Sequence, residues 1–313
     1  RENVGRNEST QDNIANGIPV SYERHFTEET RRGNMLFART GLTWHATDKD
    51  DFSVNGMLFT GKNKGYSSTP YYYGAYTAAG EVMERIRQRD SYSGGPMNMY
   101  NVEFNYRHNF TDKHFIDFIV SHNRWSSDND NIYQDYIHYM DETLPSSSSY
   151  QSRPLDINNH RTEVRADYEN PLTEHLKLEA GYNGSFSREN TPQYSYEADN
   201  WDGMNLAEDQ DYFNRFTYDN NVHALYTTLS YNKDKFGLMA GLRGEYWRIE
   251  TESLNWAQEH GTTTKDNPFK KDYFELFPSV FMSYQLTPTQ QLQLNYTRRL
   301  RRPWGGELNN FRN

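Results

Sequence analysis

Apolar and polar residues alternate with a period of two in many short runs of this chain. In residues 34–46, Leu36, Leu42 and Trp44 fall on one face, whereas Arg39 falls on the other. This alternation indicates a β-strand with one face against apolar surroundings and the other against water. We expect strands at 34–46, 51–62, 97–109, 113–124, 155–169, 176–188, 216–231, 236–252, 272–285 and 290–301, with a further one at 18–26.

The connections between these runs alternate between short and long. A soluble β-sandwich would not normally keep such an alternation, whereas a transmembrane barrel has short turns at one end and long loops at the other. We therefore predict an all-β fold, an antiparallel up-and-down transmembrane β-barrel. The short polar turns are Thr47–Asp50, Phe110–Lys113, Pro171–Glu174, Asn232–Lys235 and Leu286–Thr289, and the long irregular stretches are 63–96, 125–154, 189–217 and 253–271.

The overall composition supports a barrel. Aromatic residues make up 15% of the chain and include 25 Tyr, although the mean hydropathy is only −1.05. Disordered chains are poor in aromatics, and a soluble protein this polar would bury little apolar surface to offset its chain entropy. A transmembrane barrel accounts for both the many aromatic residues and the polar average, because every second strand residue faces a wet lumen.

The residue inventory excludes several kinds of chemistry. The chain has no cysteine, so thiol nucleophiles and cysteine-based metal sites are absent. Its net charge of −10 argues against a nucleic-acid partner. The sequence contains none of the common hydrolase, phosphate-loop or dinucleotide-binding motifs. We therefore predict no catalytic residues, no metal site and no cofactor, and we expect that the protein is not an enzyme.

Aromatic residues in the long stretches are the candidates for ligand contact. Tyr and Trp offer a flat apolar face and a polar edge, which suits an unknown small solute or oligosaccharide. The alternative is that these rings pack the extracellular crown of the barrel. The candidate residues are Tyr71, Tyr72, Tyr73, Trp125, Tyr136, Tyr194, Trp201 and Trp256.

The stretch from Tyr273 to Phe311 resembles a known family. It contains Leu276-Phe277-Pro278-Ser279, then Leu292–Arg299 with the sequence LQLNYTRR, then Arg302-Pro303. These pieces are similar to the late-barrel hairpin of the Bacteroidetes outer-membrane β-barrel family, a group of TonB-dependent receptors. The segment Leu308–Phe311 departs from the family pattern, with Asn where Pro is usual. The resemblance covers most of residues 34–313.

This resemblance implies a cell outer-membrane location and energy-coupled uptake. The implied partners are the lipid bilayer of the outer membrane and the TonB system, which acts through a plug domain that is not seen in this sequence. Uptake receptors of this class have about 22 strands, so we expect residues 1–313 to form a partial outer-membrane β-barrel of about 10–11 strands, a fragment without the plug and the C-terminal strands. The alternatives are a soluble or surface-anchored β-rich adhesin or glycan-binding protein, and a passive porin.

Overall fold

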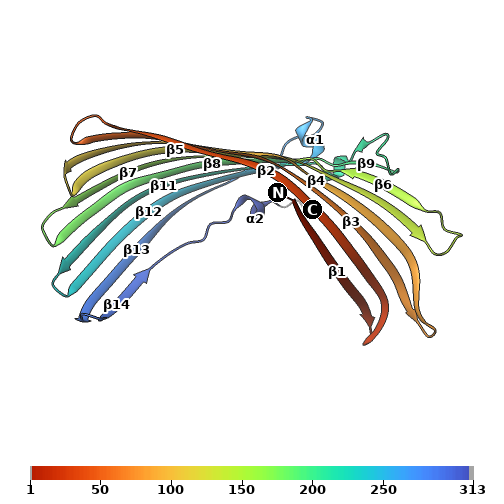
Figure 1. Ribbon diagram of the computed structural model, residues 1–313. Helices are drawn as coiled ribbons and strands as arrows, with labels where there is room; N and C mark the ends of the chain where they lie inside the picture. Colours follow the sequence, from red (N-terminus) through yellow and green to blue (C-terminus); the bar gives the residue numbers. More distant parts are fainter. Residues whose placement is uncertain (1, 310–313) are drawn as a thin grey trace.

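Long antiparallel strands make up most of the computed structural model, which describes residues 2–309 (Figure 1). Within these residues they form a 14-stranded sheet. The strands are β1 (Glu2–Ala15), β2 (Ile18–His45), β3 (Asp50–Thr77), β4 (Gly80–Thr111), β5 (His114–Tyr139), β6 (Ser147–Ser152), β7 (Leu155–Pro171), β8 (Leu176–Gln193), β9 (Tyr196–Ala198), β10 (Ala207–Glu208), β11 (Asn214–Lys233), β12 (Phe236–Leu254), β13 (Phe269–Thr287) and β14 (Gln290–Thr297).

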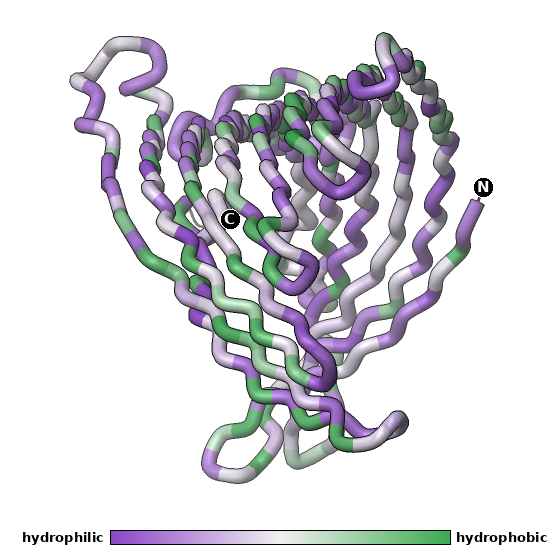
Figure 2. The backbone as a smooth tube through the Cα atoms, turned by 90° about the vertical axis from the view of Figure 1, so that its left-hand side faces the viewer, coloured by the Kyte–Doolittle hydropathy of each residue, from purple (hydrophilic) through white to green (hydrophobic). Residues whose placement is uncertain are grey.

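The main strands follow an up-and-down order. The hydrogen-bonded order is β1-β2-β3-β4-β5-β7-β8-β11-β12-β13-β14, so each long strand lies beside the long strands that precede and follow it. The short strands β6, β9 and β10 attach to the far end of β5. The sheet curves like a barrel wall and stays open within residues 2–309, with β1 and β14 at its edges (Figure 2). The predicted all-β antiparallel fold class is confirmed.

The five predicted short turns are confirmed. Each connects two long strands at the same end of the sheet, which is the left-hand end in Figure 1. In the first turn the Thr47 hydroxyl accepts hydrogen bonds from the backbone N–H groups of Lys49 and Asp50. Side-chain bonds of this kind offer turn residues a local alternative to ladder pairing, which is why polar residues mark these positions.

The far ends of the strands correct two predictions. Residues 18–26 are not a separate strand but the beginning of β2, and most of the stretch 63–96 is not a loop but the hairpin of β3 and β4. Asn16 and Gly17 join β1 to β2 with positive φ angles of 52° and 81°. An Asn-Gly pair is the usual signal for such a two-residue hairpin turn, so the sequence did contain a sign of β1 that the alternation of apolar residues missed.

The register aligns apolar residues of neighbouring strands into one continuous surface. Leu42 pairs with Val54, which pairs with Phe104; Phe104 pairs with Val120, which pairs with Val164. Side chains at paired positions share one face of a sheet, so this row crosses five strands. We call the surface the apolar belt; it occupies the half of the sheet next to the short turns, where hydrophobic positions recur along the strands in Figure 2.

The opposite face, called here the inner face, is largely polar and holds a small hydrophobic core. Phe216, Tyr218 and Trp247 lie in this core on β11 and β12, and Leu308 packs against it. Leu308 belongs to the short helix α2 (Gly305–Leu308), which lies beneath the arch of the sheet in Figure 1. Arg302, just before α2, forms an ion pair with Glu245 of β12. The chain after β14 therefore returns onto the inner face.

Part of the segment that resembles a known family lies outside the described residues, namely Asn310 and Phe311. None of the helices among residues 2–309 is long and apolar enough to cross a membrane.

Candidate ligand-binding groove

Glycines bring the backbones of β3, β4 and β5 close together in the middle of the sheet. A Cβ atom at Gly94 would collide with the backbone of Asn63, and one at Gly95 would collide with the backbone of Asp128. Only glycine permits this approach. Beside these glycines lies a hollow of about 670 Å³ on the inner face. Its polar lining includes Asn63, Ser93, Asn129 and Asn131.

A second hollow, of about 190 Å³, continues the first. The two share Asn131 and Leu155 in their linings. The second is lined by Tyr133 and Tyr212, with Arg153 between them. We call the two hollows together the inner groove. It runs across several strands rather than along one, because its lining comes from β1 to β5, from β7 and β8, and from the connections after β6, β8 and β10.

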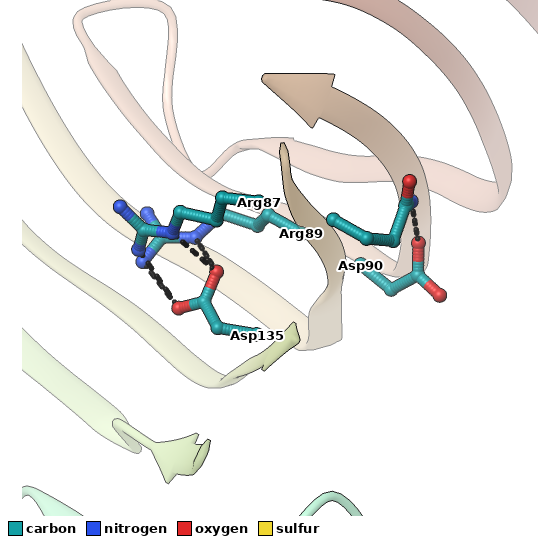
Figure 3. A network of polar contacts seen from close by, with 5 residues as sticks. Arg87, Arg89, Asp90 and Asp135 are labelled. Carbon is teal, nitrogen blue, oxygen red and sulfur yellow. Dashed lines mark hydrogen bonds and ion pairs between the residues drawn. The ribbon is translucent and has the colours of Figure 1, made fainter. Parts of the chain in front are cut away.

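Beside the inner groove, two arginines share one buried carboxylate. Arg87 and Arg89 of β4 each donate two hydrogen bonds to Asp135 of β5, at N–O distances of 2.7–2.9 Å. The Asp135 residue is only 6% exposed. Figure 3 shows the two guanidinium groups on one side of β4 and Asp90 on the other. Both ion pairs are of the bidentate kind that fixes geometry as well as charge.

These contacts shift the pKa values of the charged groups in opposite directions. Burial alone would raise the pKa of Asp135, but the hydrogen bonds from Arg87 and Arg89 outweigh it, so its pKa is lowered. The hydrogen bonds to Asp135 raise the pKa of Arg87. Asp135 and Arg87 therefore stay charged at neutral pH.

Two further arginines lie on this face against tyrosine rings. The Arg85 guanidinium lies 4.3 Å from the centre of the Tyr73 ring. Arg153 lies 4.3 Å from the centre of the Tyr212 ring and donates a hydrogen bond to its hydroxyl. Among residues 2–309, no carboxylate lies within ion-pair distance of Arg85 or Arg153. Four arginines on one face thus have a single ion-paired carboxylate, Asp135.

The arginine–tyrosine patch consists of these four arginines and the rings that they cover. Arg87 lies over Tyr71, and both Arg89 and Arg153 lie over Tyr133. Cations over aromatic faces attract each other, so the rings hold the guanidinium groups in place. The patch is made of Tyr71, Tyr73, Arg85, Arg87, Arg89, Tyr133, Asp135, Arg153 and Tyr212.

The structure brings together three of the eight aromatic candidates. Tyr71 and Tyr73 belong to the patch, and Tyr194 lines the second hollow. By strand alternation, Trp125 lies on the same face nearer the apolar belt, paired with Met99.

The other four candidates lie elsewhere. Tyr72 and Tyr136 alternate onto the opposite face. Trp201 is in the loop after β9, where its backbone carbonyl accepts a hydrogen bond from Gln134. Trp256 is in the helix α1 (Trp256–Glu259), and its indole donates to Glu208.

Sequence reasoning missed the arginines of the patch. Arg85, Arg87 and Arg89 are spaced by two residues, which places all three on one face of a strand. The significance of this spacing was missed because residues 63–96 were expected to be irregular, and a spacing of two places side chains on one face only in a strand. Within the described part of the chain, no group of three or more His, Asp or Glu side chains is arranged to hold a metal ion.

The two-faced sheet, with an apolar belt next to short turns and a polar inner face, defines an outer-membrane β-barrel protein. A family model described as the outer membrane protein beta-barrel family matches residues 108–313. The chain belongs to this family, and its location is the outer membrane. A search among curated proteins gave no match.

Solved structures similar to this chain include two receptors and a transporter. The ferric preacinetobactin receptor BauA from Acinetobacter baumannii shares 13% identity, with 88% of this chain and 46% of that chain covered, at a TM-score of 0.40. The open form of the ferric-catecholate import receptor Fiu from Escherichia coli shares 11%, with 89% and 53% covered, at 0.42. The unliganded ferric citrate transporter FecA shares 10%, with 94% and 43% covered, at 0.39.

The chain spans about half the length of these proteins.

Proposed function

We propose that this chain supplies barrel wall and ligand-capturing surface to a TonB-dependent receptor of the Bacteroidetes type. The observation that carries the proposal is the division of the sheet into two halves. One half has an apolar belt on its outer face, as lipid requires, and the other holds a groove with charged and aromatic side chains on the inner face. A barrel wall that only enclosed a water-filled channel would not need the half of the sheet that holds the groove.

In the proposed mechanism, a scarce solute reaches the inner groove from outside the cell. The tyrosine rings and amide side chains of the groove bind it, and the arginines orient any negative group. A plug domain then moves under force from TonB, which draws on the inner-membrane proton gradient, and the solute passes along the inner face. The chain binds and positions the solute, and no chemical step is assigned to it.

Growth experiments test this function. Cells carrying the intact gene, cells with the gene deleted and cells with TonB inactivated are compared on a panel of single carbon sources and single iron sources. We expect at least one nutrient to support growth only when both the gene and TonB are intact. A nutrient that needs the gene but not TonB would show that the protein is a passive porin. If every nutrient is used equally well without the gene, the uptake proposal is wrong.

A further inference from the structure

We propose that the inner groove binds an acidic oligosaccharide, a sugar chain that carries carboxylates. This inference rests on the proposed function as a solute receptor and adds the chemical class of the solute. It combines three observations about the groove: its charge, its polar lining and its shape.

The charge of the patch favours an anion. The whole chain is acidic, with 43 Asp and Glu against 33 Lys and Arg, yet the patch holds four arginines and one ion-paired carboxylate. A guanidinium group has five N–H donors in a planar fork that matches a carboxylate. Arg87 and Arg89 each use their Nε and Nη2 atoms on Asp135.

Asp135 thus acts as a positioning residue. It keeps two like-charged side chains parallel and in fixed rotamers, which lowers the entropy that a ligand must overcome when it binds them. Arg85 and Arg153 have rings rather than carboxylates as partners. Arg153 lines the second hollow, and none of the described residues that line it is acidic, so a ligand carboxylate meets no competing acid there. Arg85 lies outside the groove, in a separate hollow that Glu23, Glu84 and Asp141 also line.

The lining of the groove favours a hydroxyl-rich ligand. Asn63, Asn129 and Asn131 supply both amide donors and carbonyl acceptors, which is the combination that sugar hydroxyl groups use. In the second hollow, Gln193 Oε1 and Arg153 Nε are buried and have no hydrogen-bond partner in the described part of the chain. Buried polar atoms normally have a partner, and ligand hydroxyl and carboxylate oxygens would supply one to each.

The shape of the groove favours a chain over a compact ligand. The larger and smaller hollows adjoin at Asn131 and Leu155, which line both. Tyr133, Tyr194 and Tyr212 line the smaller hollow. Arg153 lies over the rings of Tyr133 and Tyr212, so a sugar unit would stack on the ring of Tyr194. A sugar chain would extend from these rings past the amides of the larger hollow.

Calorimetric titration of the purified full-length receptor in detergent tests the inference. The probes are the tetrasaccharides of galacturonate, mannuronate and hyaluronan, and the fully methyl-esterified form of whichever binds best. We expect one acidic chain to bind and its ester to bind at least tenfold more weakly, because esterification removes the charge but leaves the hydroxyl groups. Arg153→Gln should weaken binding of the acidic chain at least tenfold and change binding of the ester little.

The control is Arg124→Gln. Arg124 lies on the opposite face of β5, where it donates to Asn158, so its loss should leave affinity unchanged. Heat-modifiable migration on gels checks that each variant is folded. If no acidic chain binds, or if the ester binds equally well, the inference is wrong.

The two proposals can fail separately. Binding of an acidic chain without any TonB-dependent growth would overturn the uptake function and leave the groove assignment intact. TonB-dependent growth on another nutrient, with no binding of the acidic chains, would overturn only the groove assignment.

Discussion

The two halves of the same strands obey different rules. Next to the short turns, apolar residues occupy every outward position of a row such as Leu42, Val54 and Phe104. In the far half, the residues on both faces of β3 and β4 are mostly polar or aromatic, with Arg87 on one face and Asp90 on the other. The backbone is the same antiparallel ladder in both halves. The difference shows that the alternation of hydrophobic residues records the solvent on each face rather than the strand itself.

The loss of stability caused by a charged substitution should therefore differ between the two halves. In lipid, a charge on the outward face has no water to solvate it, and every backbone polar group depends on the ladder. In water, the same substitution removes only local contacts. The following predictions test this contrast, beginning with the largest expected effect.

Leu242→Arg should have the largest effect. Leu242 is 47% exposed on the apolar belt, between Thr227 and Pro278. An arginine facing the bilayer centre lowers the free energy of unfolding by about 2–4 kcal/mol. Urea titration of the full-length protein in lipid vesicles measures the change. The matched control is Leu144→Arg, since Leu144 is 48% exposed but lies in the connection between β5 and β6. Equal losses for both variants would refute the assignment of the belt to lipid.

Asp135→Asn should have an intermediate and local effect. The change removes the negative partner of Arg87 and Arg89 and leaves two like charges side by side. Because both arginines are partly exposed, we expect local opening of β4 and β5 to become easier by only about 1–2 kcal/mol. Amide hydrogen exchange of residues 85–91 and 133–137 measures it. Asp90→Asn, on the opposite face of β4, serves as the control, and an equal effect there would contradict the special role of Asp135.

Acidification should have the smallest effect. The folded pKa of Asp135 lies below its ordinary value of 3.8, so its stabilisation is fully present above about pH 4 and is lost as the pH falls through the lowered pKa. Exchange protection around Asp135, corrected for intrinsic rates, should therefore be equal at pH 7 and pH 5 and fall only in stronger acid. The Asp135→Asn variant should lack this acid step. A loss of protection already at pH 5 would contradict the lowered pKa.

Sequence patterns predicted the membrane half of the fold well. The alternation over residues 34–46 and the polar turn at Thr47–Asp50 lie where the structure has them, because lipid on one face and water on the other impose a period of two. The far half was predicted as irregular because water on both faces imposes no such period. There, strand pairing depends on β-compatible Tyr, Ser and Thr residues and on turns such as Asn16-Gly17.

The groove was harder to predict than the fold. The aromatic candidates included Tyr71, Tyr73 and Tyr194, which do lie at the patch and groove. Arg153 joins them only through the path of the chain after β6, and Asp135 only through the register of β4 and β5. Register over such long strands depends on every pair at once, and no local pattern of residues encodes it.

The pairing of each long strand with its sequence neighbours has a consequence for how such proteins change over generations. Inserting or duplicating one hairpin adds two strands at a single seam and leaves every other ladder with its original partner. A barrel wall built in this way can widen by one hairpin at a time. The short turns fix the spacing of the hairpins at the membrane, while the opposite ends of the strands are free to diverge and to acquire new binding surfaces.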